Sequence, residues 1–268
     1  GYITRYCVGG VEMLKEGSAI SPNFWRAPTD NDFGANLQLR YSVWKAPRIL
    51  LKSSDYKVED GIFHMTNSYE MVGIGVLTLE YGINNAGVLR ISEDMKADET
   101  FDVSNLFRFG MQIVMPKDFG KVVYYGRGPI ENYADRNNCT DIGIYSQSVD
   151  EQPYHYIRPQ ETGTRTDIRW WNVLNAGGVG LKITSEASFS ASALHYTIES
   201  LDEGVAKHNV HFQEVPVADL TNVLVDKVQM GLGGINSWGS LPRDEYMLPF
   251  GDYSFTFVLS PVKYIDNN

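Results

Sequence analysis

Apolar and polar residues alternate along several segments of the chain. In residues 76–83, Leu77, Leu79 and Tyr81 fall on one side of the alternation and Thr78 falls on the other. Because successive side chains of a β-strand point to opposite faces, this pattern predicts a strand with one buried face. The same argument predicts strands at 106–115, 121–125, 179–184, 223–230 and 253–259.

Helical signals are few. The string S-L-D-E at 200–203 matches a capping box and predicts a short helix over residues 200–208. Residues 36–44 predict a second short helix. The chain has no alternation of strands with long helical segments, which excludes a parallel α/β barrel and a Rossmann sheet.

Turn-forming residues separate the alternating runs. The string N-N-A-G at 84–87 lies between two such runs and predicts a hairpin. The sequence contains no linker, internal repeat or low-complexity tract. We therefore predict one all-β domain over residues 1–268, built as a large antiparallel sandwich.

Composition narrows the classes of function. The formal net charge of −10 disfavours contact with phosphate backbones and predicts no nucleic-acid partner. No run of 18 apolar residues is present, so we predict no membrane-spanning helix. The chain holds 16 Tyr, 12 Phe and 5 Trp. Most of them fit a half-buried pleated surface, and such rings also suit the C–H face of a sugar.

The cysteines and the first residues are less informative. Cys7 and Cys139 cannot form a disulfide framework or a thiolate zinc site by themselves. We predict two buried thiols, with one disulfide as the alternative. The chain begins without Met and without a signal-peptide layout, which we interpret as a fragment or a processed chain of unknown compartment.

The first polar motif is P-N-F-W-R-A-P-T-D-N-D-F-G at residues 22–34. Its Asp and Asn side chains can bond nearby backbone N–H groups, which makes such loops rigid. Asp30 and Asp32 are also oxygen ligands of the kind that calcium binds, but the spacing of a full calcium loop is absent. We favour the structural interpretation and predict no metal site.

The second motif is Y-Y-G-R-G-P-I-E-N-Y-A-D-R at residues 124–136, directly after a predicted strand. Arg127, Glu131, Asp135 and Arg136 can pair with one another or bind sugar hydroxyls. Because a proline and no long helix follow the two glycines, the string is not a nucleotide-binding loop. We favour an ion-pair network here.

The third motif is Y-H-Y-I-R-P-Q-E-T-G at residues 154–163, followed by Trp170 and Trp171. These residues are suited to a polar cleft with aromatic walls. Glu161 and His155 resemble an acid–base pair, although a histidine in such a setting is more often a packed residue.

The fourth motif is Q-M-G-L-G-G-I-N-S-W-G at residues 229–239, where a predicted strand ends in a glycine-rich loop. A large aromatic side chain is costly to expose, so Trp238 requires a partner. Either Trp238 packs into the core of this domain, or it projects toward a sugar or a neighbouring domain.

The four motifs, in this order, resemble the C-terminal domain of the bacterial β-galactosidases of glycoside hydrolase family 2, often called the small chain. The resemblance implies a supersandwich of antiparallel strands similar to galactose mutarotase. It also implies that the partners are a galactoside sugar and the upstream barrel and sandwich domains of the same enzyme, with a homo-oligomer as a further option. The strings that carry it are F-W-R-A-P-T-D-N-D, G-R-G-P-x-E-N-Y-x-D-R, R-P-Q-E-x-G and G-G-x-x-S-W-G.

The same resemblance implies that this chain contains no catalytic residue. In the family, the two catalytic glutamates lie in an upstream (β/α)₈ barrel, which needs roughly 200 residues of its own. The chain cannot hold both that barrel and the sandwich, so Glu131 and Glu161 are assigned to the sandwich. Any Mg²⁺ or Na⁺ cofactor is likewise assigned to the barrel, and the chain is expected to be inactive alone.

One residue of this chain is expected to contact substrate. In the family, the Trp of G-G-x-x-S-W forms an apolar platform for the sugar at the rim of the active site. The matching residue here is Trp238. Many relatives carry two Asp before Ser-Trp, whereas this chain carries Ile235 and Asn236, so the loop lacks those charges.

Two other functions remain open from the residues alone. The first is a stand-alone aldose mutarotase-like enzyme, which needs a general acid and a general base near the sugar ring oxygen. The second is a non-catalytic module for glycan binding or assembly. The histidines available to a mutarotase-like site are His64, His155, His195, His208 and His211.

Overall fold

The chain folds into antiparallel β-structure, as the alternating segments predict. The computed structural model describes residues 1–236 and 238–263. Within these residues, twelve strands join into one sheet, and β1 (Cys7–Val8) and β2 (Val11–Glu12) form a separate ribbon. The strands of the large sheet are β3 (Ser21–Asn23), β4 (Ile49–Glu59), β5 (Ile62–Met71), β6 (Gly75–Ile83), β7 (Leu89–Ala97), β8 (Arg108–Met115), β9 (Lys121–Gly128), β10 (Asp141–Ser148), β11 (Arg165–Leu174), β12 (Val179–Leu194), β13 (Thr221–Gln229) and β14 (Tyr253–Lys263).

The sheet branches at β12, its longest strand. The main path runs β10-β9-β11-β12-β14-β7-β6-β5-β4. The first half of β12 pairs with β14, whereas the second half pairs with β13, which continues to β8 and β3. The predicted sandwich therefore consists of two layers of one curled sheet, and its strands pair antiparallel throughout the described residues.

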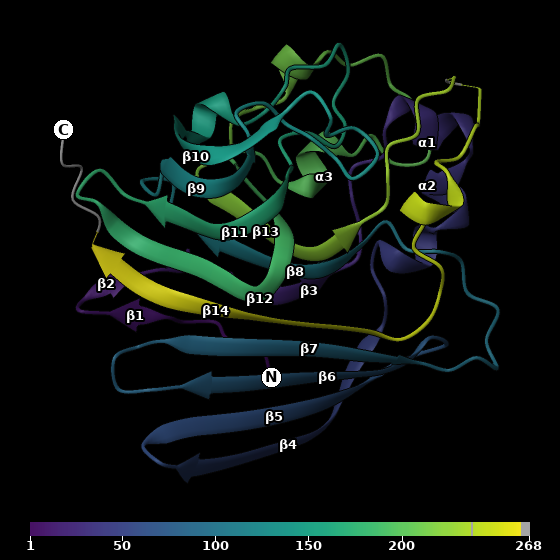
Figure 1. The fold of residues 1–268 in the computed structure, drawn as a ribbon. Helices are drawn as coiled ribbons and strands as arrows, with labels where there is room; N and C mark the ends of the chain where they lie inside the picture. Colours follow the sequence, from purple (N-terminus) through teal and green to yellow (C-terminus); the bar gives the residue numbers. More distant parts are fainter. Residues whose placement is uncertain (237, 264–268) are drawn as a thin grey trace.

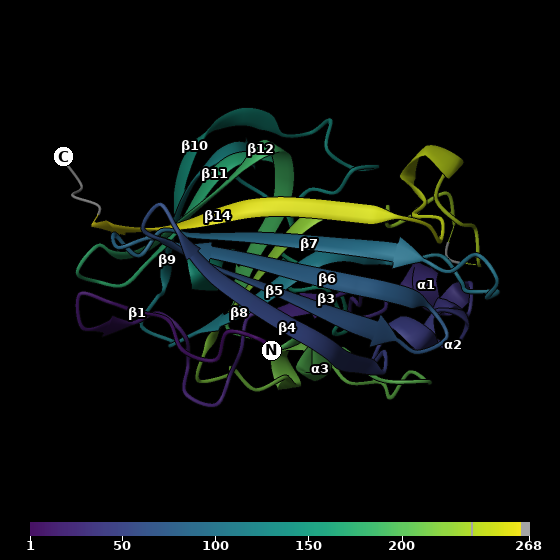
Figure 2. The ribbon, with the colours of Figure 1, turned by 90° about the horizontal axis from the view of Figure 1, so that it is seen from below.

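The core lies between these layers. Strands β4 to β7 and β14 form one broad layer, and β3, β8 and β13 lie behind it (Figures 1 and 2). Leu77 and Leu79 of β6 are completely buried, as their alternation predicts. Phe109 of β8 stacks on Tyr253 of β14 with a centroid separation of 5.3 Å, which joins the two layers.

The predicted hairpin at 84–87 is confirmed. It connects β6 to β7, and the Asn84 side chain accepts hydrogen bonds from the N–H groups of Ala86 and Val88. Gly87 has a φ of 77°, which glycine adopts without steric cost.

The helices are short and lie outside the sheet. The segment predicted at 36–44 contains a helix followed by a 3₁₀ turn, as expected. None of the helices in the described part of the chain is long and apolar enough to cross a membrane. The helical elements are α1 (Asp30–Gly34), α2 (Leu37–Arg40), η1 (Ser42–Trp44), η2 (Val149–Glu151), α3 (Ile198–Leu201), η3 (Phe212–Glu214) and η4 (Asp244–Tyr246).

The predicted helix over 200–208 is wrong. The capping box lies three residues before the predicted one, with Thr197 as the N-cap and Ser200 as its partner. The single turn α3 that it starts ends at Leu201. The Glu203 carboxylate instead pairs with Arg158 and accepts the N–H of His208, which holds this segment as a loop.

The cysteine prediction is wrong in part. Cys7 and Cys139 are free, which excludes the disulfide alternative, but both are exposed rather than buried. Cys7 lies in the short outer strand β1, and Cys139 lies in the turn before β10. Neither position belongs to the core between the layers.

The hairpin of β4 and β5 carries exposed apolar side chains. Tyr56 and Val58 are 74% and 71% exposed, and the Tyr56 ring stacks on Phe63 at 5.9 Å. Tyr56 lies opposite Met65, and Val58 lies opposite Phe63. Directly opposite residues share one face of a sheet, and every second residue of a strand lies on that same face. Tyr56, Val58 and Phe63 therefore lie on the face on which Tyr69 is buried further along β5. The face that is buried at Tyr69 is thus exposed to solvent at the tip of the β4–β5 hairpin.

Candidate functional site

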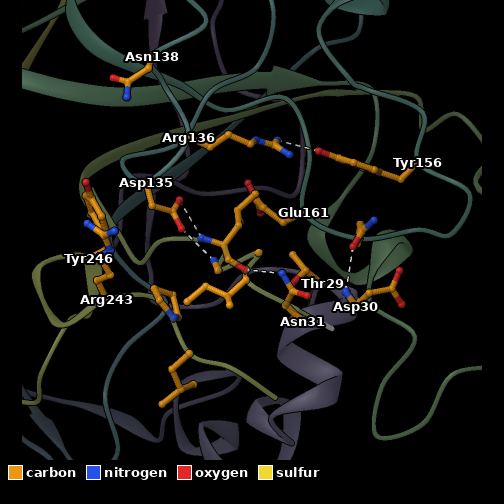
Figure 3. A pocket seen from close by; sticks show the side chains of 17 residues that line it. Thr29, Asp30, Asn31, Asp135, Arg136, Asn138, Tyr156, Glu161, Arg243 and Tyr246 are labelled. Carbon is orange, nitrogen blue, oxygen red and sulfur yellow. Dashed lines mark hydrogen bonds between the residues drawn. The ribbon is translucent and has the colours of Figure 1, made fainter. Parts of the chain in front are cut away.

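The four sequence motifs meet at one cavity, which we call the motif pocket. Its volume is about 850 Å³, and segments far apart in the chain form its walls (Figure 3). The convergence of all four motifs makes this cavity the candidate site. The lining residues are Thr29, Asp30 and Asn31 from the first motif, Asp135 and Arg136 from the second, Tyr156, Gln160 and Glu161 from the third, Leu232, Gly233, Gly234 and Ile235 from the fourth, and Asn138, Leu241, Pro242, Arg243 and Tyr246.

A buried ion pair supports the first motif. The Arg26 guanidinium donates to both carboxylate oxygens of Asp32, with N–O distances of 3.0 and 2.8 Å, and both side chains are inaccessible to solvent. Asp32 also accepts the N–H of Thr29, whose hydroxyl in turn caps α1. Asp32 is therefore a structural residue, as we favoured. The described residues contain no group of three or more His, Cys, Asp or Glu side chains placed to hold a metal.

Asp30 lies at the edge of the pocket beside two cations. Its carboxylate is 2.7 Å from Arg158 and also accepts from Lys207. Burial by itself raises the pKa of the Asp30 carboxyl, but Lys207 and Arg158 together lower it. Asp30 thus ties the first motif to the third.

The second and third motifs are joined through Glu131. This buried carboxylate accepts from Arg136 at 2.6 Å, from the Tyr156 hydroxyl, and from the Gly163 N–H at 2.7 Å. Burial, and then the Glu131 charge, raise the pKa of the Tyr156 phenol. Of the predicted ion-pair network, the pair of Glu131 and Arg136 is correct, whereas Arg127 bonds Asp167 instead.

Glu161 belongs to a second buried network. It accepts from the Arg108 guanidinium at 3.2 Å and from the Thr164 hydroxyl at 3.0 Å. Asp226 lies 3.5 Å from the same guanidinium. Burial raises the pKa of Asp226 to about 7, with Glu161 adding to the effect and Arg108 opposing it.

The suggested acid–base pair of the third motif is not formed. The His155 ring stacks on Phe212 at 4.6 Å, while Glu161 is held by Arg108. The buried His195 is bonded to the Leu220 carbonyl instead. None of the five histidines lines the motif pocket, so the pocket offers no histidine for mutarotase-like chemistry.

The glycine-rich loop of the fourth motif is held by the other motifs. The Asp135 carboxylate accepts the N–H groups of Leu232 and Gly233 at 3.0 and 2.9 Å, and Asn31 donates to the Leu232 carbonyl at 3.0 Å (Figure 3). Arg26 donates to the Met230 carbonyl at 2.7 Å. The first two motifs therefore determine the path of the fourth.

Trp238 lies on this loop, and its side chain is 88% exposed. The interpretation that Trp238 packs into the core is therefore wrong. The backbone N–H of Trp238 donates to the Asn236 side chain at 2.9 Å, so Asn236 forms a local turn before Trp238. Ser237 lies outside the described residues. Ile235, which lines the pocket, is 79% exposed, so the loop exposes two large apolar side chains, Ile235 and Trp238.

Sequence reasoning missed two residues of this arrangement. The sequence predicts no role for Arg26, and it predicts Asp135 to be part of an ion-pair network. Their contacts to the glycine-rich loop span 204 and 97 positions of the chain. No local signal in the sequence predicts such partners.

Comparison with known proteins identifies the family and the relatives that this chain resembles. A family model described as "Beta galactosidase small chain" matches residues 1–259. The β-galactosidase of Priestia megaterium is 32% identical over 98% of this chain and 25% of its own length. The β-galactosidase of Streptococcus thermophilus is 31% identical over 94% of this chain and 24% of its own length. The chain thus spans about a quarter of these curated relatives. Among solved structures, a galactose mutarotase related enzyme from Lactobacillus acidophilus is similar with a TM-score of 0.48 and 9% identity, over 96% of this chain and 89% of that chain.

Proposed function

Because this chain belongs to the β-galactosidase small chain family, we propose that it is the domain of a β-galactosidase that completes the sugar site without carrying the catalytic acids. The observation that carries this proposal is the exposed Trp238 on a loop that the other three motifs hold in place or border. A domain that spans a quarter of its relatives leaves room for the catalytic part elsewhere.

An exposed indole is suited to bind a pyranose. Its face covers the C–H face of the sugar ring, and its N–H remains free to bond a hydroxyl. Stacking that removes about 100 Å² of apolar area from water is worth about 2–3 kcal/mol before the cost of ordering. This supports a substrate-binding role for Trp238 and a galactoside as the ligand.

Glu131, beside the motif pocket, and Glu161, in its wall, are poorly suited to glycoside hydrolysis. A retaining glycosidase needs two carboxyl groups about 5 Å apart, one free to attack and one able to donate a proton. Glu131 is bound to Arg136 and Tyr156, and Glu161 is bound to Arg108. These engaged carboxylates support a catalytic centre outside this chain.

The proposed partner is the remainder of the same enzyme. Three quarters of the length of each relative lies outside the matched region. The exposed side chains of Tyr56, Val58 and Phe63 on the core-facing side of the β4–β5 hairpin provide an apolar surface for such packing. Covering this surface within the enzyme would remove it from water.

The purified chain is expected to show no hydrolysis of a nitrophenyl β-D-galactoside above the buffer rate. The reason is that Glu131 and Glu161 are already engaged in ion pairs with arginines. The assay is release of nitrophenol, with the β-galactosidase polypeptide that contains this chain as the positive control. Robust turnover by the chain alone would overturn the proposal.

Replacing Trp238 with alanine in that β-galactosidase is expected to raise the KM for galactosides about tenfold or more, because the stacking surface is lost. The fold should be unaffected, since the side chain is 88% exposed. Trp238→Phe keeps an aromatic face and should retain most of the binding. Unchanged kinetics combined with a lower melting temperature would show instead that Trp238 serves stability.

A further inference from the structure

We propose that Asp135 is a positioning residue for Trp238, fastening the base of its loop through the backbone. Only the expected effect on catalysis rests on the proposed function. The fastening itself concerns this chain alone and can be measured separately.

The first step is the contact itself. Each oxygen of the Asp135 carboxylate accepts a different backbone N–H, from Leu232 at 3.0 Å and from Gly233 at 2.9 Å. Hydrogen bonds to an ionised acceptor are about twice as strong as neutral ones. A carboxylate is also able to accept both N–H groups, whereas an amide offers one oxygen.

The second step is that the loop is shaped for this carboxylate. A Cβ atom at Gly231 would lie 2.6 Å from Cγ of Asp135 and 3.0 Å from Cβ of Tyr246. Gly231 does not have a positive φ, so its backbone conformation is open to other residues. Glycine is therefore required at position 231 by the close approach of Asp135.

The third step is that Asp135 is itself rigidly held. It lies in a tight turn in which the backbones of Tyr133 and Arg136 bond each other in both directions, at 3.2 and 2.8 Å. The Tyr133 side chain is buried, and Arg136 is bonded to the buried Glu131. The Asp135 carboxylate is thus attached to a turn whose backbone and side chains are held in place on both sides.

The fourth step concerns the far end of the loop. A Cβ at Gly239 would lie 2.8 Å from the carbonyl oxygen of Gly34, at the end of α1. The loop is therefore anchored at Leu232 and Gly233 by Asp135 and packs closely against the first motif at Gly239. Trp238 lies between these two points. Glycines lose the most backbone entropy on ordering, so a loop of this composition depends on such anchors.

The test compares Asp135→Asn with Asp252→Asn. Asp252 is a matched control because its carboxylate also accepts a backbone N–H, that of Ala97 at 2.9 Å, and it does not line the motif pocket. In this chain, hydrogen exchange of the Leu232 and Gly233 amides should accelerate about tenfold or more in Asp135→Asn, because a charge-assisted bond is lost. The control should leave both rates unchanged. Equal exchange in Asp135→Asn and the unaltered chain would overturn the proposal.

The kinetic arm separates this inference from the proposed function. In the β-galactosidase that contains the chain, Asp135→Asn should raise KM with little change in kcat, and it should add nothing when Trp238 is already alanine. If Trp238→Ala changes KM but Asp135→Asn does not, the positioning role is wrong and the proposed function stands. If Trp238→Ala has no effect while the amides exchange faster in Asp135→Asn, the fastening is supported and the proposed function fails.

Discussion

Replacing Arg26 with alanine is expected to lower the free energy of unfolding of this chain by about 3–5 kcal/mol. The guanidinium is inaccessible to solvent and makes two bonds to Asp32. It also bonds the carbonyls of Met230 and Gly231 and lies over the Phe107 ring at 4.6 Å. Without it, Asp32 becomes an unpaired buried carboxylate and two carbonyls lose their donor, so the cost of desolvation is no longer offset.

The measurement is urea unfolding followed by circular dichroism, with the midpoint and slope fitted together. Arg5→Ala is the control, because Arg5 also pairs with a carboxylate, that of Glu12, but on the surface. The control should leave the unfolding midpoint unchanged, since exposed pairs contribute little. Arg26→Lys should fall between the two because it keeps the charge and loses the fork. An Arg26→Ala midpoint equal to that of the control would contradict this account.

Replacing Glu93 with glutamine is expected to stabilise the chain increasingly as pH rises. Glu93 lies on β7 within the core, and both of its carboxylate oxygens lack a hydrogen-bond partner among the described residues. Burial, and then the Asp226 charge, raise the pKa of the Glu93 carboxyl well above its usual value. Between the unfolded and the folded pKa of this carboxyl, the folded chain keeps it protonated, whereas the unfolded chain ionises it.

The sign follows from this difference in bound protons. The folded state binds more protons than the unfolded state above the unfolded pKa of about 4.3, so stability falls as pH rises from there toward the folded pKa. Glutamine is neutral in both states and removes this loss, which approaches about 1.4 kcal/mol per pH unit within the window. Asp226, with a pKa of about 7, contributes a loss of the same sign that ends near pH 7. The variant should therefore retain a weaker dependence below pH 7.

The measurement is the free energy of unfolding in urea at pH 5, 7 and 8.5 for the unaltered chain and for Glu93→Gln. Glu80→Gln is the control, because Glu80 is exposed on the opposite face of the adjacent strand β6. The difference between Glu93→Gln and the unaltered chain should grow with pH, while Glu80→Gln should show no such trend. A difference that is constant across the three pH values would mean that Glu93 is not held protonated.

Strands were predictable where one face meets the core and the other meets water. Strand β6 is of this kind, and so is the start of β14, since burial of one face produces the alternation directly. Strand β4 was missed because it is the edge of the sheet, and residues from Leu51 to Glu59 are exposed on both faces. The second half of β12 was missed for the opposite reason, since it is buried on both faces and pairs with β13.

The sequence by itself determined the all-β class, the hairpin at 84–87, the four motifs and the prominence of Trp238, because each depends on neighbouring residues. Only the tertiary structure decided that Trp238 is exposed, that Arg26 and Asp135 hold its loop, and that Glu161 pairs with Arg108. The physical reason is that the loop residues bonded by Arg26 and Asp135, and the Arg108 partner of Glu161, lie 53 to 205 positions away in the chain. Such contacts depend on how the curled sheet brings its loops together, and local residue patterns do not encode that arrangement.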